Sequence, residues 1–494
     1  MSTITPLLHE AYASERFQEQ GQALVEELSS YLKQLDSLPT NPYAAPADEL
    51  AFWQELLHRE GGQGKASPLA TVLARTVRVH QPKYMGHQIS PPVPTLALAD
   101  QLSALLNAGM GVYEMGRAGS ALEQLVILEF CQLLGLAKGA GGFLTHGGTL
   151  ANLTALLAAR ASRWPGKQEV WETGATDELK PCLLVNEQAH YCIDRAVRIM
   201  GWGAGGIRKV SNDDQFRIRT DLIEAAITEA KQEGYTPVLI VGSACTTSTG
   251  SFDDLTALAD VAERHNLWFH VDGAHGAPLA ISEQHRHLLA GLDRADSVAM
   301  DFHKMCCVPA LTTALFFKNA KDSYRTFHQQ ADYLLNFDSE DEWYNLGRRT
   351  FECTKQMLSL RVFSLLYQHG PQFLQDYLDR VCWLGKEMAD QISSRPDFEL
   401  AIQPDCNIVC FRYFPKHSQR SLAELNSLNQ IIREEIMREG EFYLVSTRLR
   451  GVFYLRCTLS NAFTKAEHIK ALLDKVTAIG EATQSMKNSL GSLH

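Results

Sequence analysis

Polar and ionisable residues follow the short apolar runs of this sequence at several points. A glycine turn with a hydroxyl, Gly147-Gly148-Thr149, stands before a helical pattern, while Asp272 and Lys304 come after two further runs. Ligands of open α/β sheets bind beyond the carboxyl ends of the strands, so we expect these side chains to meet at one edge. The free N–H groups of a first helical turn favour a phosphate there, and glycines let it approach closely.

The types of these residues match the needs of one cofactor, pyridoxal phosphate. A lysine amine forms a Schiff base with its aldehyde, and burial among apolar neighbours is expected to lower the pKa of Lys304 for that task. A carboxylate beside the pyridine nitrogen keeps it protonated and makes the ring an electron sink. Asp272, 32 positions before the lysine (304 − 272), is the candidate. His190, at another strand end, could stack on the ring and move a proton.

Each of these residues also has an ordinary structural interpretation. A glycine turn is commonly only a turn, and an Asp at a strand end is commonly a helix cap. It is their joint order that favours a cofactor site. The stretch 201–206 fits Gly-x-Gly-x-x-Gly, but it follows a predicted helix rather than a strand, so we interpret it as a turn. His80, His87 and His146 are irregularly spaced, and no metal site is predicted from them.

Composition excludes several classes of protein. The chain has 494 residues, enough for one large domain and smaller additions, and its net charge of −11 without a basic run argues against nucleic acid as a partner. Eleven scattered cysteines without a Cys-x-x-Cys pair favour a reducing compartment. The start of the chain lacks a signal-peptide pattern, and no apolar window is long enough to cross a membrane. We therefore expect a cytoplasmic protein.

Periodicity predicts three parts. Residues 1–75 form a helical segment, with an amphipathic helix at 21–32, a proline-rich arm at 38–46, and a second helix at 49–59 that ends at the glycines of 61–64. Residues 76–370 alternate helices with strand-length runs, which indicates a mostly parallel sheet covered by helices on both sides. Residues 371–494 form a smaller α+β domain. The strands predicted in the last two parts lie at 142–144, 182–185, 238–241, 267–271, 297–300, 315–317, 408–411 and 452–455. The helices predicted there lie at 150–159, 255–265 (N-cap Asp253), 373–392, 425–439 and from 465 on.

Four segments, in this order, resemble the group II pyridoxal-phosphate-dependent amino acid decarboxylases, which include glutamate, aromatic amino acid and diaminobutyrate decarboxylases. They are Thr145-His146-Gly147-Gly148-Thr149-Leu150-Ala151-Asn152, Gln188-Ala189-His190, His270-Val271-Asp272-Gly273-Ala274-His275-Gly276 and Asp301-Phe302-His303-Lys304-Met305. The likeness extends over roughly residues 75–465. It implies a fold-type-I, aminotransferase-like domain and an obligate homodimer with active sites at the interface, in which the N-terminal segment wraps the partner.

The resemblance also implies a role for individual residues. Lys304 would be the Schiff-base lysine, Asp272 the partner of the pyridine nitrogen, and His190 the stacking histidine. The remaining cofactor contacts would be Gly147, Gly148, Thr149 and His303 at the phosphate, Ala274 against the ring and Thr247 near the phenolic oxygen. Substrate contacts would come from Gln88, Tyr344 and Arg349, with Arg349 near the substrate carboxylate.

The sequence departs from the family pattern at a few positions. His146, Thr149 and Leu150 replace Ser, Ser and Glu of the usual phosphate turn, and Phe302 replaces the proline before His-Lys. Several members carry a loop tyrosine that protonates the decarboxylated intermediate. Tyr344, in the loop 336–345, is not clearly aligned with it, so the identity of that acid stays open.

The predicted activity is the decarboxylation of an L-amino acid to a primary amine and CO2. Residues 107–114 and 88–90 resemble glutamate decarboxylase, which favours a small acidic substrate such as glutamate or aspartate. One alternative is another fold-type-I enzyme, an aminotransferase or a carbon–sulfur lyase, since Asp272 and Lys304 would serve those equally well. The other is a cofactor-binding homologue without turnover.

Overall fold

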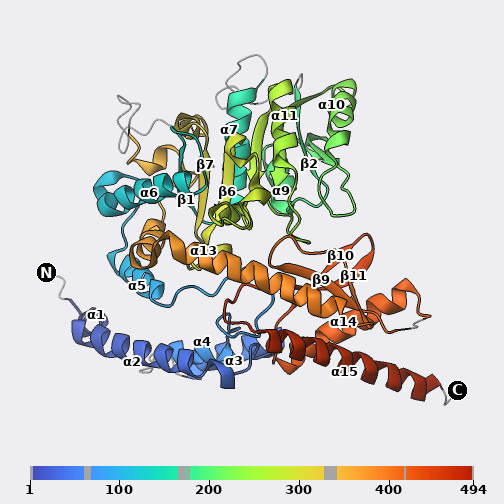
Figure 1. Ribbon diagram of the computed structural model, residues 1–494. Coiled ribbons are helices and arrows are strands. Elements are labelled where there is room, and N and C mark those ends of the chain that lie inside the picture. The colour runs from blue at the N-terminus through green and yellow to red at the C-terminus, as the bar shows by residue number, and fades with distance from the viewer. Residues whose placement is uncertain are drawn as a thin grey trace.

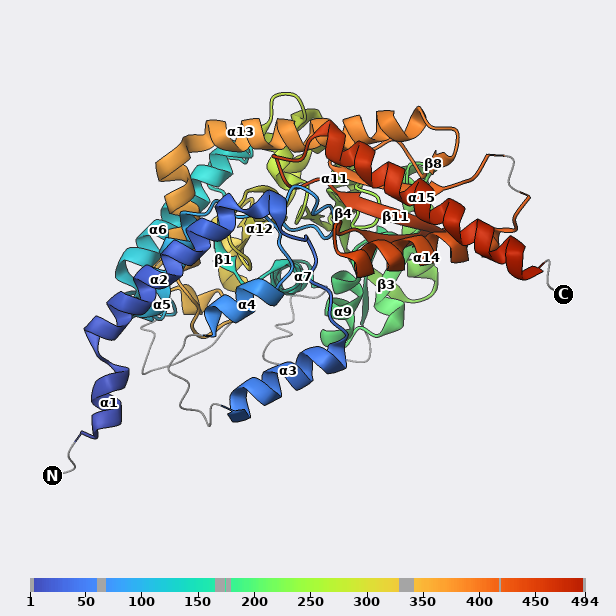
Figure 2. The ribbon, with the colours of Figure 1, turned by 90° about the horizontal axis from the view of Figure 1, so that it is seen from below.

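The computed structural model describes residues 4–59, 68–164, 174, 179–327, 342–416 and 419–491. The turn at 61–64 and most of the loop 336–345 lie outside these ranges. At the N-terminus stand four helices: α1 (Pro6–Ala11), α2 (Ser14–Lys33), α3 (Pro46–Arg59) and α4 (Leu69–Arg75). They lie below the main body in Figure 1, and Figure 2 shows α1 and α2 extending away from the C-terminus. Among the described residues, no helix is both long and apolar enough to cross a membrane.

A seven-stranded sheet forms the centre of the large domain. Its strands are β1 (Gly141–Thr145), β2 (Lys180–Asn186), β3 (Ile207–Val210), β4 (Tyr235–Ser243), β5 (Trp268–Asp272), β6 (Ser297–Asp301) and β7 (Thr313–Phe317), in the order β1-β7-β6-β5-β4-β2-β3. The five strands from β6 to β3 pair in parallel, whereas β7 runs antiparallel to both β6 and β1. The mostly parallel sheet is therefore confirmed. The run at 207–210 was not predicted as a strand.

Helices cover both faces of this sheet, because alternate strand residues point to opposite sides. Ile240 packs in one core, and its neighbours Leu239 and Val241 pack in the other. The helices of this domain are α5 (Leu96–Leu106), α6 (Tyr113–Leu133), α7 (Gly148–Arg163), α9 (Tyr191–Ile199), α10 (Ile223–Gln232), α11 (Leu255–His265) and α12 (Phe302–Met305). α7 and α9 pack on the Leu239 side, and α6, α10 and α11 on the other. This layered arrangement agrees with the expected fold.

The predicted cap of α11 was wrong by one residue. The side chain of Asp254, not Asp253, accepts the N–H of Ala257 and caps the helix. Asp253 is buried instead, where its carboxylate accepts backbone N–H groups of Ile218 and Ser243 and an amide hydrogen of Asn186. Burial raises the pKa of Asp253 to about 6, even though these donors oppose the rise. Two adjacent aspartates look alike in sequence, and only the tertiary contacts distinguish them.

A four-stranded antiparallel sheet forms the small domain, in the order β10 (Val445–Leu449), β11 (Val452–Thr458), β9 (Ile408–Tyr413) and β8 (Phe398–Leu400). It is covered by α14 (Leu422–Glu439), α15 (Ala466–Gly491) and the end of α13 (Leu358–Ser393), which runs between the two sheets in Figure 1. α13 is interrupted at Gly370, where φ is 69°. Beyond this kink, Leu374, Leu378 and Val381 pack in the large-sheet core, whereas Leu384, Met388 and Ile392 pack in the small-sheet core.

Candidate active site

A cavity of about 290 Å³ lies beyond the carboxyl ends of the large sheet's strands. All the predicted cofactor contacts line it: Gly147, Gly148, Thr149, His190, Thr247, Asp272, Ala274, His303 and Lys304. The predicted substrate residue Gln88 lines it as well. The cavity therefore collects side chains that are more than 200 positions apart in the chain, as expected for a site at the sheet edge.

The first turn of α7 forms one wall of this cavity. Gly147 precedes the helix with φ of 95°, a conformation that side chains with a Cβ rarely adopt, so the turn requires glycine there. Asn152, one turn further along, accepts a hydrogen bond from Nε2 of the buried His270 at 2.8 Å. Burial lowers the pKa of His270 to about 4, so this imidazole is neutral and acts as a structural link. The link ties the α7 turn to β5, the strand that ends at Asp272.

Lys304 is held by a carboxylate that sequence reasoning had not assigned a role. Its Nζ lies 2.8 Å from Oδ2 of Asp301, whose side chain is 2% exposed. Burial alone would lower the pKa of Lys304, but the charges of Asp301 and Asp272 outweigh it and the pKa is raised. The expectation that apolar burial lowers this pKa was therefore wrong. Burial opposes the ionisation of Asp301 too, yet Lys304 and His303 keep the pKa of that carboxyl low.

Asp272 and His190 face the same cavity from β5 and from the start of α9. Asp272 is 7% exposed, and its Oδ1 accepts the N–H of Ala274 at 3.3 Å. The Nδ1 atom of His190 accepts the N–H of Cys192, also at 3.3 Å, which leaves the proton of the neutral ring on Nε2. Burial lowers the pKa of His190, with Asp272 opposing the shift. The imidazole is thus neutral near pH 7 and able to donate from Nε2.

Two further cavity residues are fixed by contacts outside the cavity. The guanidinium of Arg456, on β11 of the small domain, donates to the carbonyl oxygens of Thr247 (2.7 Å) and Ser248 (3.0 Å). The ring of His303 contacts the backbone of Thr312 through Nδ1, 3.1 Å from the carbonyl oxygen. Burial lowers the pKa of His303, although Asp301 opposes this. Both domains therefore contribute to the position of the cavity wall.

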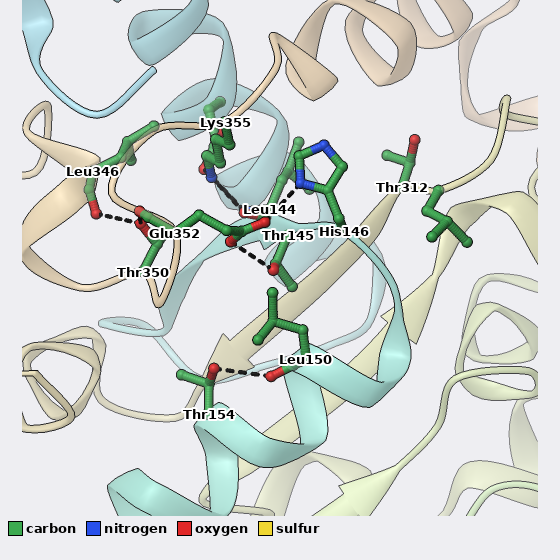
Figure 3. A network of polar contacts seen from close by, with 12 residues as sticks. Leu144, Thr145, His146, Leu150, Thr154, Thr312, Leu346, Thr350, Glu352 and Lys355 are labelled. Carbon is green, nitrogen blue, oxygen red and sulfur yellow. Dashed lines mark hydrogen bonds and ion pairs between the residues drawn. The ribbon is translucent and has the colours of Figure 1, made fainter. Parts of the chain in front are cut away.

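A polar network centred on Glu352 contacts the two residues that precede Gly147, and one of them, His146, lines the cavity (Figure 3). Glu352 contacts Nδ1 of His146 at 2.6 Å and accepts the Thr145 hydroxyl at 3.0 Å. Burial would raise the pKa of Glu352, but His146, Lys355 and Thr145 outweigh it, and the pKa is lowered. An ionised Glu352 thus fixes the imidazole that replaces the usual serine of the turn. The partners lie 206 positions apart, so no sequence motif could reveal the pair.

The other two predicted substrate residues do not line the cavity. Tyr344 packs edge-on against Tyr113 and Trp343. Arg349 is 3% exposed and lies over the rings of Phe143 and Tyr324. Their contact with substrate therefore stays a prediction.

Sequence reasoning gave no role to several residues that do line the cavity. They are His146, Asn152, Cys192, Cys245, His275, Asp301 and Leu311. Asp301 has the clearest signal, since it stands at a strand end three positions before Lys304. His146, Asn152, Cys245 and His275 also stand close to predicted strand ends, whereas Cys192 and Leu311 reach the cavity through tertiary packing.

The residues present fit pyridoxal phosphate. The helix N-terminus, the Thr149 hydroxyl and His303 suit a phosphate, Lys304 suits an aldehyde, and Asp272 suits a ring nitrogen. Gly148 keeps this cradle open, because a Cβ there would lie 3.2 Å from the Asp301 carboxylate, which would have to move slightly. The cavity volume is also close to that of small-molecule sites, which begin at about 300 Å³.

Comparison with known proteins agrees with this geometry. The family model described as the pyridoxal-dependent decarboxylase conserved domain matches residues 68–414. Cysteine sulfinic acid decarboxylase of Mus musculus is 28% identical over 424 residues, which is 83% of this chain and 84% of that protein. Acidic amino acid decarboxylase GADL1 of Homo sapiens is 26% identical over 484 residues, 96% of this chain and 92% of that protein.

A solved structure shows the same fold. The crystal structure of mouse CSAD in its apo form superposes with a TM-score of 0.84 at 25% identity, over 93% of this chain and 99% of that one. The chain belongs to the pyridoxal-dependent decarboxylase family. It is accordingly an amino acid decarboxylase that depends on pyridoxal phosphate, with the fold-type-I architecture expected from the sequence.

Proposed function

We propose that this enzyme decarboxylates a small acidic L-amino acid, with Lys304, Asp272 and His190 as its catalytic residues. The observation that supports these roles is their convergence on one cavity with the helix N-terminus at Gly147-Gly148-Thr149. The Asp301–Lys304 ion pair supports them further, because it directs the lysine amine to a defined place before any ligand arrives.

Each residue has a task that its surroundings suit. Lys304 would hold the cofactor aldehyde, and the N–H groups of the α7 turn would hold its phosphate together with Thr149 and His303. When bound, pyridoxal phosphate accepts the electron pair that the departing carboxylate leaves behind. Asp272 would hold the proton on the ring nitrogen through its negative charge. Neutral His190 would pack on the ring, and its Nε2–H is a candidate proton source at the substrate Cα.

The acidic substrate is supported by the names of the relatives and by one feature of the cavity. Cysteine sulfinic acid and the acidic amino acids named for the two relatives carry an anionic side chain. At the cavity, Glu352 fixes the His146 imidazole through Nδ1, so a polar ring with a defined orientation lines the space where a polar side chain of the substrate would bind. Gln88 offers a neutral amide for the same purpose. Aspartate, glutamate and cysteine sulfinate are the candidates.

A homodimer is part of the proposal. None of the residues of α2 is buried, and Val25 of its apolar stripe is 47% exposed. On α5, Leu98, Leu102, Leu105 and Leu106 are between 48% and 65% exposed. Apolar surface of this extent calls for a partner, and a second copy of the chain is the simplest one. We assign the enzyme to the cytoplasm, which suits its eleven free cysteines.

The test is product analysis with a panel of single amino acids. Aspartate, glutamate, cysteine sulfinate, 2,4-diaminobutyrate and tyrosine are each incubated with the enzyme in D2O, and CO2, amine and keto acid are measured. We expect CO2 and an equal amount of amine carrying one deuterium at the former Cα, from an acidic substrate and not from tyrosine. Lys304→Ala is the control and should release none. Formation of keto acid without CO2, or turnover of only the basic or aromatic substrate, would contradict the proposal.

A further inference from the structure

A second group of chemically reactive side chains lies where the two domains meet. Cys245 follows β4, His275 follows β5, and Cys406 precedes β9 of the small domain. One donor atom from each of the three lies within 4.8 Å of the other two. The three residues are 8%, 2% and 2% exposed. Because they are 30 (275 − 245) and 131 (406 − 275) positions apart, no spacing in the sequence could indicate the group.

The histidine of this group has an unsatisfied nitrogen. Nε2 of His275 lies 2.9 Å from Oδ1 of Asn407, and the Nδ2 of Asn407 donates to the Leu459 carbonyl and the Ser460 hydroxyl. The amide oxygen is therefore the acceptor, and Nε2 of His275 carries the hydrogen. Nδ1 is then left with a lone pair, and among the described residues it is buried without a hydrogen-bond partner. A buried polar atom without a partner is destabilising and rare in folded proteins, so its presence requires an explanation.

This arrangement is the one that metal-binding histidines adopt. They donate their second ring N–H to a carbonyl or carboxylate, which fixes the tautomer and aims the lone pair at the metal. Here the Asn407 oxygen accepts the Nε2 hydrogen, which leaves Nδ1 as the nitrogen that is free to bind a metal. Zinc with bonds of about 2.3 Å to sulfur and 2.0–2.1 Å to nitrogen spaces its donors by about 3.5–3.8 Å. These spacings fit inside the 4.8 Å limit that the three donors already satisfy.

The donor set selects the kind of ion. Two thiolates and one imidazole suit Zn²⁺, whereas Mg²⁺ and Ca²⁺ prefer oxygen ligands. Two thiolate charges also balance a divalent cation, so the buried site carries no net charge. Cys406 would give up a weak contact with the Gly250 carbonyl oxygen, now at 3.6 Å. Cys245 and His275 also line the active-site cavity, which offers water access to a fourth coordination position.

We propose that Cys245, His275 and Cys406 bind one Zn²⁺ ion. The ion joins the large domain, which supplies Cys245 and His275, to the small domain, which supplies Cys406. It lies beside the cavity wall, since Thr247 and Ala274 are each within two positions of a ligand.

Metal content of the full-length, cofactor-loaded protein tests the proposal. The protein is reduced, incubated with ZnCl2, desalted and analysed for zinc. We expect one zinc per chain in the wild type, and at least a tenfold lower content in Cys406→Ser and His275→Gln. The matched control is Cys410→Ser, which removes a buried thiol on β9 that contacts Ser248 and should leave the zinc content unchanged. Far-ultraviolet circular dichroism shows whether each variant is folded.

X-ray absorption of the wild type provides a second measurement that needs no variant. Two sulfur ligands and at least one nitrogen ligand around zinc support the site, as do tetrahedral Co²⁺ bands in the red, away from cofactor absorption. The proposal is overturned if the loaded wild type holds no stoichiometric zinc and its thiols titrate as free. It is equally overturned if the mass of the chain falls by two hydrogens because Cys245 and Cys406 form a disulfide, or if the Cys406 and His275 variants retain zinc.

Discussion

The ion pair between Lys355 and Glu123 offers the sharpest test of how the active site is supported. Nζ of Lys355 lies 2.6 Å from Oε1 of Glu123, and each side chain is 1% exposed. Lys355 also donates to the carbonyl oxygen of Leu144, whose N–H donates to Glu123 at 2.9 Å. The pair therefore clamps the end of β1 immediately before the glycine turn. Lys355→Met keeps an unbranched side chain that is one atom shorter and removes its charge, which leaves Glu123 buried and uncompensated.

The expected loss of stability follows from the ways in which Glu123 can respond. Leaving a buried charge without its partner costs about 3–5 kcal/mol. Protonation of Glu123 sets a ceiling at pH 7, because neutralising a carboxyl with an ordinary pKa of about 4.3 costs about 1.4 kcal/mol per pH unit, or about 3.7 kcal/mol. We therefore expect a loss of about 3–3.5 kcal/mol at pH 7. The variant's Glu123 has a raised pKa in the folded state, so the loss shrinks as the pH falls and is about 1.5 kcal/mol at pH 5.5.

Urea unfolding of the apoenzyme at one fixed protein concentration measures both values. Lys470→Met is the control, because Lys470 and Asp474 form an exposed pair, 67% and 49% accessible, whose loss costs about 0–1 kcal/mol. Affinity for pyridoxal phosphate should also fall in Lys355→Met, since the turn loses its support. A loss below about 1 kcal/mol at pH 7, or a loss that does not change between pH 7 and 5.5, would refute the reasoning.

Three further predictions concern catalysis, pH dependence and assembly. Asp272→Ala should lower kcat by about 10³-fold or more, measured by CO2 release, because the charge beside the ring nitrogen is lost; turnover near the wild-type rate would exclude that role. Asp253 has a folded-state pKa of about 6, above its ordinary value, so wild-type stability should decline as the pH rises from about 4 to 6, relative to Asp253→Asn in parallel urea titrations; equal slopes would contradict this. Deletion of residues 1–45 should weaken the dimer and lower cofactor occupancy in sedimentation experiments, and an intact, loaded dimer would show that α2 takes no part in assembly.

Much of the site was predictable because strand ends are recognisable in sequence. Asp272 and Lys304 follow apolar runs that can be identified by their length and composition, and a parallel sheet brings such ends together. The state of Lys304 was not predictable in the same way. Its pKa depends on the balance between burial and the charge of Asp301, and that balance is set by distances of a few ångströms. The contact between His146 and Glu352 likewise depends on how the chain returns after β7.

The fold was predictable to a similar degree. The strand at 238–241 is a continuous apolar run, as buried parallel strands usually are, and the run at 267–271 is interrupted only by His270. β3 was missed because Arg208 and Lys209 interrupt its apolar pattern, and the strand forms because it pairs with β2 at the sheet edge. The antiparallel direction of β7 is a consequence of the short α12 connection, which has no room for a crossover.

The part of α13 beyond the kink packs in the cores of both domains, which affects how the protein unfolds. Its first turns complete the large-sheet core through Leu374 and Leu378, and its last turns complete the small-sheet core through Met388 and Ile392. If the chain were divided at residue 370, this helix would stay with the small domain, and the core of the large domain would lose the apolar side chains that the helix supplies. Neither half therefore contains a complete interior of its own. We therefore expect the large and the small domain to unfold as one cooperative unit.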